Sequence, residues 1–379
     1  MCVAGSIPAT RADVPRFGPI GSKWGTSYVK GRNMTHGYAE PGSTDAIRDQ
    51  PISEVGSDEP TQRADRLARV PWAAVVVFIV TSFGLAWLVA LPLWILGPED
   101  GSFTLLLGII APAMMFTPSL AVLVVTFVMR IPANGSRLRF LGMWPLRPAK
   151  RVVWWSVAAI FVPAFIVAAT VGVSALFGWI SLDLTHFSGY AESVEAMLPA
   201  GSDVALPPIG MLVAIQLAAI PFGAIFNSVV AAGEEIGWRG WLITALRPLG
   251  VWPALLFSGM LWGLWHAPLI LLGYNFGLTD WRGVALMTVG CMAWGVLFGW
   301  SRLRTGSVWP AALGHGALNA SAGMMLLVAA AGAPIDPALV SPLGAAGWIV
   351  IAIIVVVLAV SGQFRHEPAL AAKRVLTSR

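Results

Sequence analysis

The feature that most constrains the fold of this chain is a succession of long apolar segments separated by short polar loops. A helix needs about 20 apolar residues to cross a bilayer, and only 11% of all residues here are charged, against about 25% in a soluble globular protein. We therefore expect an all-α, polytopic membrane protein with about eight transmembrane helices. The apolar segments are 71–96, 103–129, 152–177, 207–247, 251–273, 283–300, 308–330 and 343–361.

The fourth apolar segment, 207–247, is too long for one straight crossing of a bilayer. Pro221 lies within it, and a proline inside a helix removes a backbone hydrogen bond and clashes with the preceding turn. The sequence leaves two alternatives open. Pro221 either divides the segment into a short lead-in and a main helix, or it kinks a single helix.

The two ends of the chain differ from its centre. Residues 1–69 are rich in Gly, Pro, Ser and charged residues and have no sustained apolar period, so we expect a disordered cytoplasmic tail. Residues 70–362 hold the apolar segments and are expected to form a transmembrane helical bundle. Residues 363–379 are expected to form a basic cytoplasmic tail.

Arginine and lysine residues are concentrated in alternate loops. They occur in both tails and after the second, fourth and sixth apolar segments, whereas the 178–206 loop has none and carries Asp183, Glu192, Glu195 and Asp203. Short loops rich in Lys and Arg stay in the cytoplasm. The pattern predicts a multi-pass protein of the cell membrane, with the lipid bilayer as its partner and both termini in the cytoplasm. Because the basic residues flank apolar segments, the net charge of +5 does not indicate a nucleic-acid partner.

Five ionisable side chains interrupt the apolar segments, and they are Glu234, Glu235, Arg239, His266 and His315. An ionisable group at the centre of a bilayer costs roughly 2.5–3.5 kcal/mol on insertion scales, and such groups usually pair with one another and mark a functional site. We therefore expect the five to meet in one buried polar cluster.

Helical spacing sorts these residues into pairs. Glu235 and Arg239 stand four positions apart, so they share a face and favour an ion pair, which we interpret as structural. Glu234 is displaced by about 100° around the helix and need not join that pair. His315 and Asn319 also stand four positions apart and can point into one cavity. Small residues let membrane helices approach closely, and the glycines near these positions are Gly233, Gly237, Gly240, Gly259, Gly263, Gly314 and Gly316.

Three segments of the chain resemble motifs of one protein family. Residues 234–239 match EExxxR, residues 315–319 match HxxxN, and residues 262–266 resemble FxxxH with Trp262 in place of the phenylalanine. Together these motifs resemble the CPBP family of intramembrane glutamic endopeptidases, which is related to type II CAAX prenyl endopeptidases and to bacteriocin-processing proteins. The region of resemblance runs from about 205 to 330.

The resemblance implies a catalytic role for four residues. Glu234 and His266 would activate a water molecule for attack on the scissile peptide bond, and His315 and Asn319 would stabilise the oxyanion. A buried carboxylate suits the first role because desolvation makes it a stronger base.

The remaining motif residues are assigned to support of the site. Glu235 and Arg239 would hold the motif helix in place, and the implied chemistry needs no metal or other cofactor. The expected substrates are peptide precursors or segments of membrane proteins rather than prenylated peptides.

Three other functions stay open at this point. A zinc protease is one, because His266, His315 and a glutamate form a set that binds zinc in some hydrolases, although no HExxH motif occurs and Cys2 and Cys291 suggest no thiol metal site. A transporter is the second, because intramembrane Glu and His residues also build proton relays. The third is a non-catalytic membrane protein, of the immunity or scaffold type, on a retained protease fold.

Overall fold

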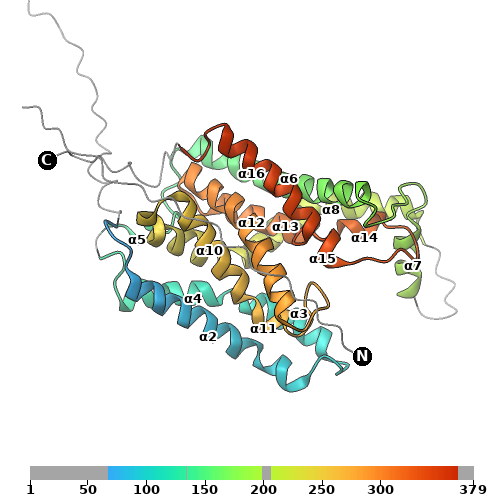
Figure 1. The fold of residues 1–379 in the computed structure, drawn as a ribbon, viewed down its shortest axis with the longest axis horizontal. Helices are drawn as coiled ribbons and strands as arrows, with labels where there is room; N and C mark the ends of the chain where they lie inside the picture. Colours follow the sequence, from blue (N-terminus) through green and yellow to red (C-terminus); the bar gives the residue numbers. More distant parts are fainter. Residues whose placement is uncertain (1–66, 134, 199–205, 366–379) are drawn as a thin grey trace, which may run out of the picture. The chain divides into compact units, whose positions relative to one another are not determined.

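The computed structural model describes residues 67–133, 135–198 and 206–365, and in this part of the chain the regular structure is helical, with no strand beyond an isolated β-bridge between Leu182 and Ala329. The predicted all-α fold is confirmed. The predicted tails fall almost entirely on residues 1–66 and 366–379, outside the described residues. The helices, labelled as in Figure 1, are α2 (Trp72–Leu96), α3 (Phe103–Met114), α4 (Thr117–Leu123), α5 (Arg137–Phe140), α6 (Ala149–Leu176), α7 (Ser188–Ala196), α8 (Ile209–Glu235), α9 (Ile243–Leu246), α10 (Val251–Trp265), α11 (Ala267–Ile270), α12 (Trp281–Thr305), α13 (Trp309–Ser321), α14 (Met324–Val328), α15 (Pro337–Val340) and α16 (Ala345–Val360), together with the π-helices η1 (Val124–Val128) and η2 (Ile236–Leu242) and the 3₁₀-helix η3 (Arg247–Leu249).

Seven of the described helical segments are long and apolar enough to cross a membrane, which confirms a polytopic membrane protein. They are Trp72–Leu96, Phe103–Val128, Ala149–Leu176, Ile209–Leu249, Trp281–Thr305, Trp309–Val328 and Pro337–Val360. The remaining expected span, 251–273, is the 15-residue helix α10 followed by the one-turn helix α11. At 1.5 Å per residue α10 is about 22 Å long, shorter than the roughly 30 Å hydrocarbon core of a bilayer.

The long fourth segment is not divided at Pro221. Helix α8 continues through this proline and ends at Glu235, where the chain widens into the π-helix η2. Membrane helices tolerate an internal proline because neighbouring groups satisfy the freed backbone atoms. Of the two alternatives, the structure therefore has one continuous helix at Pro221, and its irregular turn comes directly after the two glutamates.

Close packing at glycines brings the motif helices together, as their positions predicted. Figure 1 shows α10 beside α12 and α8 beside α13, and these are the two largest helix contacts. A Cβ atom added at Gly263 of α10 would lie 2.3 Å from the Thr288 Cα of α12, and one added at Gly316 of α13 would lie 2.4 Å from the Ala224 oxygen of α8. Only glycine permits these backbone approaches.

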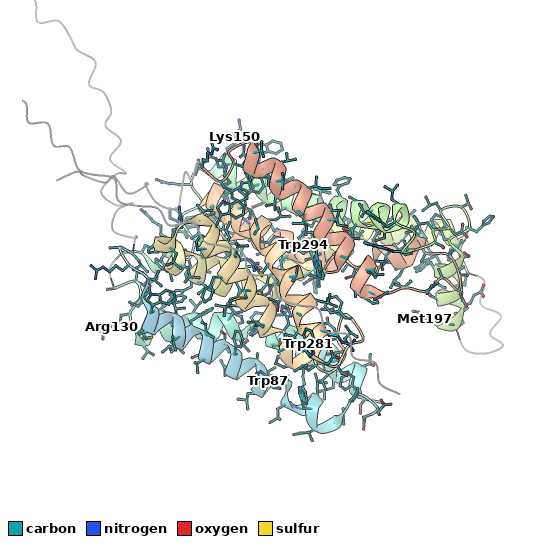
Figure 2. The ribbon with its side chains drawn as sticks, in the orientation of Figure 1. Trp87, Arg130, Lys150, Met197, Trp281 and Trp294 are labelled. Carbon is teal, nitrogen blue, oxygen red and sulfur yellow. The ribbon has the colours of Figure 1, made fainter. Side chains whose placement is uncertain are left out.

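The basic loops meet at one end of the bundle. The Val308 amide donates to the Gly142 carbonyl over 2.9 Å, and Trp309 Nε1 donates to the Met143 carbonyl over 3.1 Å. These bonds join the loop before α6 to the turn between α12 and α13. Figure 2 labels Arg130 and Lys150 toward the left, at this end.

The loops that lack basic residues meet at the opposite end. The Asp183 amide donates to the Val328 carbonyl over 2.9 Å, and the Gly189 amide donates to the Ala329 carbonyl over 3.2 Å. Met197, in the loop that follows α7, lies toward the right in Figure 2. The helices therefore separate the basic loops from the described part of the acidic loop, 178–198, as the sequence pattern predicted; which end faces the cytoplasm stays a prediction.

Candidate active site

The five ionisable residues of the apolar segments come from three separate parts of the chain. Glu234 and Glu235 end α8 and Arg239 follows in η2, with exposed fractions of 1%, 0% and 0%. His315 lies in α13 with an exposed fraction of 4%, and the half-buried His266 stands at the junction of α10 and α11. The expected polar cluster exists, and it lies where α8, α10 and α13 approach one another.

Glu235 is the centre of a three-residue polar network. Its Oε1 atom accepts a hydrogen bond from Arg239 Nη1 over 2.8 Å and lies 3.0 Å from His315 Nδ1. An ionised carboxylate can only accept, so Nδ1 of His315 carries the proton in this contact. The predicted pair of Glu235 and Arg239 is present, and His315 joins it, which the sequence did not predict.

Glu234 is separate from that network. Its Oε2 atom accepts a hydrogen bond from Trp262 Nε1 over 2.5 Å. The two adjacent carboxylates thus have different partners, as the 100° rotation between them suggested. Trp262 replaces the phenylalanine of the FxxxH motif, and its indole N–H supplies the hydrogen bond that a phenyl ring has no atom to make.

Aromatic rings enclose Arg239 and His315. The Arg239 Cζ atom lies 4.2 Å from the centroid of the Trp262 ring and 5.5 Å from that of Phe298. The His315 ring meets Trp262 in a T-shaped contact, with centroids 5.2 Å apart, and stacks on Phe298 at 5.7 Å. Such ring faces attract a guanidinium by cation–π interaction. The apolar rings around the ion pair therefore still stabilise the positive charge of Arg239.

The backbone of α10 fixes the proton of His266. His266 Nδ1 lies 2.8 Å from the Trp262 carbonyl oxygen, one helical turn earlier. Because a carbonyl oxygen only accepts, Nδ1 donates, and Nε2 of the neutral ring keeps its lone pair. Cys291 Sγ lies 3.9 Å from the same Nδ1 atom. His266 therefore presents Nε2 as an acceptor.

Asn319 is placed differently from the other candidates. It lies one turn beyond His315 on α13 but is exposed, and no side-chain hydrogen bond links it to the described residues of the cluster. The structure therefore brings Glu234, His266 and His315 together around Trp262, but it does not bring the Asn319 side chain into contact with them.

The donor atoms of a metal site do not converge here. Within the described residues, no three His, Cys, Asp or Glu side chains are close enough to hold a metal ion. Nδ1 of His315 faces Glu235, and Nδ1 of His266 faces the Trp262 carbonyl. Nδ1 of each ring is therefore engaged, and Nε2 is its remaining nitrogen.

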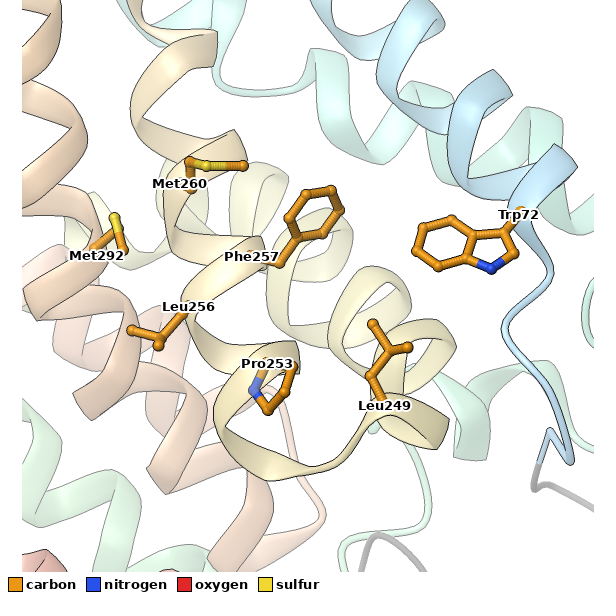
Figure 3. Close-up of a pocket in the computed structure, with 7 residues that line it drawn as sticks. All are labelled: Trp72, Leu249, Pro253, Leu256, Phe257, Met260 and Met292. Carbon is orange, nitrogen blue, oxygen red and sulfur yellow. The ribbon is translucent and has the colours of Figure 1, made fainter. Parts of the chain in front are cut away.

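An apolar groove of about 340 Å³ lies on another face of α10 (Figure 3). Trp72, from the start of α2, faces Leu249 and Phe257 across it. None of the motif residues lines this groove, which holds only apolar side chains: Trp72, Leu249, Pro253, Leu256, Phe257, Met260 and Met292. It offers no chemistry and is not part of the site.

Two site residues were missed in the sequence. Trp262 was identified only as the replacement for the motif phenylalanine and given no role, although it contacts Glu234 directly, and Phe298 was not singled out. The position of Trp262 in the second motif was a signal that it lies near the first. No comparable signal marks Phe298, because a phenylalanine on an apolar helix is ordinarily core.

The part of the chain that holds these residues matches a known family. Residues 209–321 match the family described as "Type II CAAX prenyl endopeptidase Rce1-like". The match begins at α8, includes all three motifs and ends at the last residue of α13. It confirms the resemblance stated from the motifs: this part of the chain is similar to that family. No curated protein matches the chain.

Proposed function

We propose that this protein is an intramembrane endopeptidase that hydrolyses peptide bonds of peptide or membrane-protein substrates with a water molecule activated by Glu234 and His266. The observation that carries the proposal is the separation of two adjacent buried carboxylates. Glu235 is committed to Arg239 and His315, whereas Glu234 has only the indole of Trp262 as a side-chain partner among the described residues. Glu234 thus keeps a carboxylate oxygen for a reacting water.

The reaction needs one base and one route for the proton. Water gives a proton to Glu234 while its oxygen bonds to the carbonyl carbon, and the π electrons of the carbonyl move to its oxygen. When those electrons return, the C–N bond breaks and the leaving nitrogen takes the proton from Glu234. One water is consumed, and one carboxyl and one amino terminus are formed. A buried carboxylate suits this exchange because a base in an apolar site is less solvated than in water.

His266 is proposed as the second acceptor for the water. Its Nδ1 donates to the Trp262 carbonyl, which leaves Nε2 to accept a hydrogen bond from the attacking water. Two acceptors, Glu234 and His266, orient both hydrogen atoms of one water and direct its lone pair toward the substrate. Because the water is already held in place, less entropy is lost on the way to the transition state.

His315 and Asn319 are proposed to act on the substrate oxygen. His315 Nδ1 is held by Glu235, so the ring can donate to an oxyanion only through a protonated Nε2. Asn319 is exposed on the same helix and would donate once a substrate lies along α13. We propose no metal or cofactor, and we place the protein in the cell membrane with both termini in the cytoplasm.

The proposal is tested with purified protein in lipid nanodiscs. Membrane peptides from cells that carry the wild type are compared with those from cells that carry Glu234→Gln, and peptides cleaved only by the wild type are then tested in vitro. We expect loss of cleavage in Glu234→Gln, retention in the control Glu192→Gln, an exposed residue of α7, and no effect of exhaustive chelation. Cleavage by Glu234→Gln at the wild-type rate, or stoichiometric zinc lost together with activity, would overturn the glutamate mechanism.

A further inference from the structure

Trp262 contacts every charged or titratable member of the cluster except Glu235. Its indole Nε1 donates to Glu234 over 2.5 Å, its carbonyl accepts from His266 over 2.8 Å, and its ring carries the Arg239 guanidinium at 4.2 Å. The same ring meets His315 in a T-shaped contact. Among the described residues, Glu235 and Phe298 each contact two of these groups, Arg239 and His315, whereas Trp262 contacts all four.

Trp262 is itself immobilised. It is 2% exposed and lies in the last turn of α10, where Gly259 and Gly263 bring that helix against α12. Arg239 lies on its face and is anchored by the bond to Glu235. Because Arg239, His315 and the packing of α10 hold the Trp262 side chain in one position, it is suited to position another group.

We propose that Trp262 is the positioning residue of Glu234. The indole holds Oε2 in place, so Oε1 is directed to the reacting water. The guanidinium on the ring face draws electron density from the indole and strengthens its N–H as a donor. The acceptor adds to this effect, because a hydrogen bond to an ionised carboxylate is stronger than one to a neutral group. The link runs from the ion pair of Glu235 and Arg239 through the indole to Glu234. Its catalytic consequence rests on the proposed function.

The first test compares two tryptophan variants in kinetic assays with an identified substrate. Trp262→Phe keeps a ring face for Arg239 but removes the N–H. Trp294→Phe removes a different buried indole bond, 2.8 Å to the Pro342 carbonyl, and serves as the matched control. We expect Trp262→Phe to lower kcat by about 10- to 100-fold, by analogy with the loss seen when groups that orient metal ligands are removed, with KM changed less than about twofold. Trp294→Phe should leave kcat near the wild-type value.

The second test needs no substrate. In protein labelled with ¹⁵N at tryptophan, the indole signal of Trp262 is assigned by its loss in Trp262→Phe. We expect Glu234→Gln to move its proton signal upfield, because a neutral amide oxygen is a weaker acceptor than a carboxylate. The indole signal of Trp294 should stay in place.

The outcomes separate this inference from the proposed function. An unmoved Trp262 signal, or a wild-type kcat in Trp262→Phe, would overturn the positioning role even in an active peptidase. A moved signal in a preparation that cleaves no peptide would support the link between Trp262 and Glu234 while the peptidase function fails.

Discussion

At the scale of single residues, hydrogen bonding gives two adjacent glutamates different roles. Glu235 compensates a buried guanidinium and a histidine, so its charge is part of what keeps the interior stable. Glu234 has one neutral donor, Trp262, and compensates no cation directly. Removing one partner of a buried pair leaves an uncompensated charge, whereas removing a singly bonded carboxylate does not.

The corresponding variants should therefore fail in different ways. Glu235→Gln should lower the free energy of unfolding by about 3–5 kcal/mol, as the loss of one partner does in buried ion pairs. Glu234→Gln should unfold near the wild-type temperature but lose peptidase activity. Thermal unfolding and activity are measured on both in the same nanodiscs. A stable, inactive Glu235→Gln together with an active Glu234→Gln would mean that the two roles are reversed.

At the scale of helices, the site depends on glycine contacts and on one widened turn. The π-helix η2 begins directly after Glu235 and places Arg239 beneath the Trp262 ring. π-helical turns are often found at functional sites. On the other side, α10 carries Trp262 and His266 and is held against α12 at Gly259 and Gly263.

Gly263 offers a test of this packing. In Gly263→Ala the new Cβ would lie 2.3 Å from the Thr288 Cα, so the backbones of α10 and α12 have to separate. Overpacking of this kind typically costs about 1–3 kcal/mol, and we expect activity to fall as well because His266 moves with α10. The control is Gly84→Ala in α2, where no atom lies within 4 Å of the added Cβ. Equal unfolding temperatures for the two variants would contradict the close approach.

The loop at 183–188 is built around the carboxylate of Asp183, so we expect its stability to depend on pH. The Asp183 carboxylate accepts hydrogen bonds from the amides of His186, Thr185 and Ser188. The His186 amide bond is the main cause that lowers the pKa of Asp183, with Ser188 and Thr185 adding to it. A carboxylate with a lowered pKa stabilises the folded loop above its unfolded pKa, and this contribution is lost as pH falls through the folded pKa.

The loop at 183–188 should therefore be ordered at neutral pH and open under strong acid. We expect amide hydrogen exchange at Thr185, His186 and Ser188, corrected for the intrinsic rate, to rise as pH falls below about 4, the usual value for aspartate. Asp183→Asn should exchange faster at neutral pH and lose most of the acid dependence. Protection that is unchanged down to pH 2 would contradict the role given to this carboxylate.

At the scale of the whole molecule, much of the fold could be predicted from the sequence, because a bilayer restricts the length and composition of the helices that cross it. Segment length located the apolar helices to within a few residues, and spacing identified the pair of Glu235 and Arg239. The hydrogen bond from Trp262 to Glu234 could not be predicted, since it depends on how α8 and α10 meet. The exposure of Asn319 depends in the same way on the packing of α13. The sequence did not predict that α10 ends at Trp265, because the apolar composition continues to residue 273.

The membrane topology depends on the short helix α10. Between the loop at 177–189 and the loop at 328–331, the chain passes along α8, α10, α12 and the pair α13–α14. The two loops are hydrogen-bonded to each other, with the Ala330 amide donating to the Ser181 carbonyl over 2.9 Å. An even number of crossings must therefore separate them, so α10 with α11 has to count as a crossing despite its length.

Reporter fusions test this count and the orientation together. We expect cytoplasmic signals at positions 140 and 370, the second of which lies outside the described residues, and extracytoplasmic signals at 190 and 336. The basis is the concentration of Lys and Arg in the loop at 130–151, against none in the loop at 178–206. If α10 failed to cross, 190 and 336 would report opposite sides, although the structure joins their loops. If both reported the cytoplasm, the crossing count would stand and the orientation inferred from charge would be wrong.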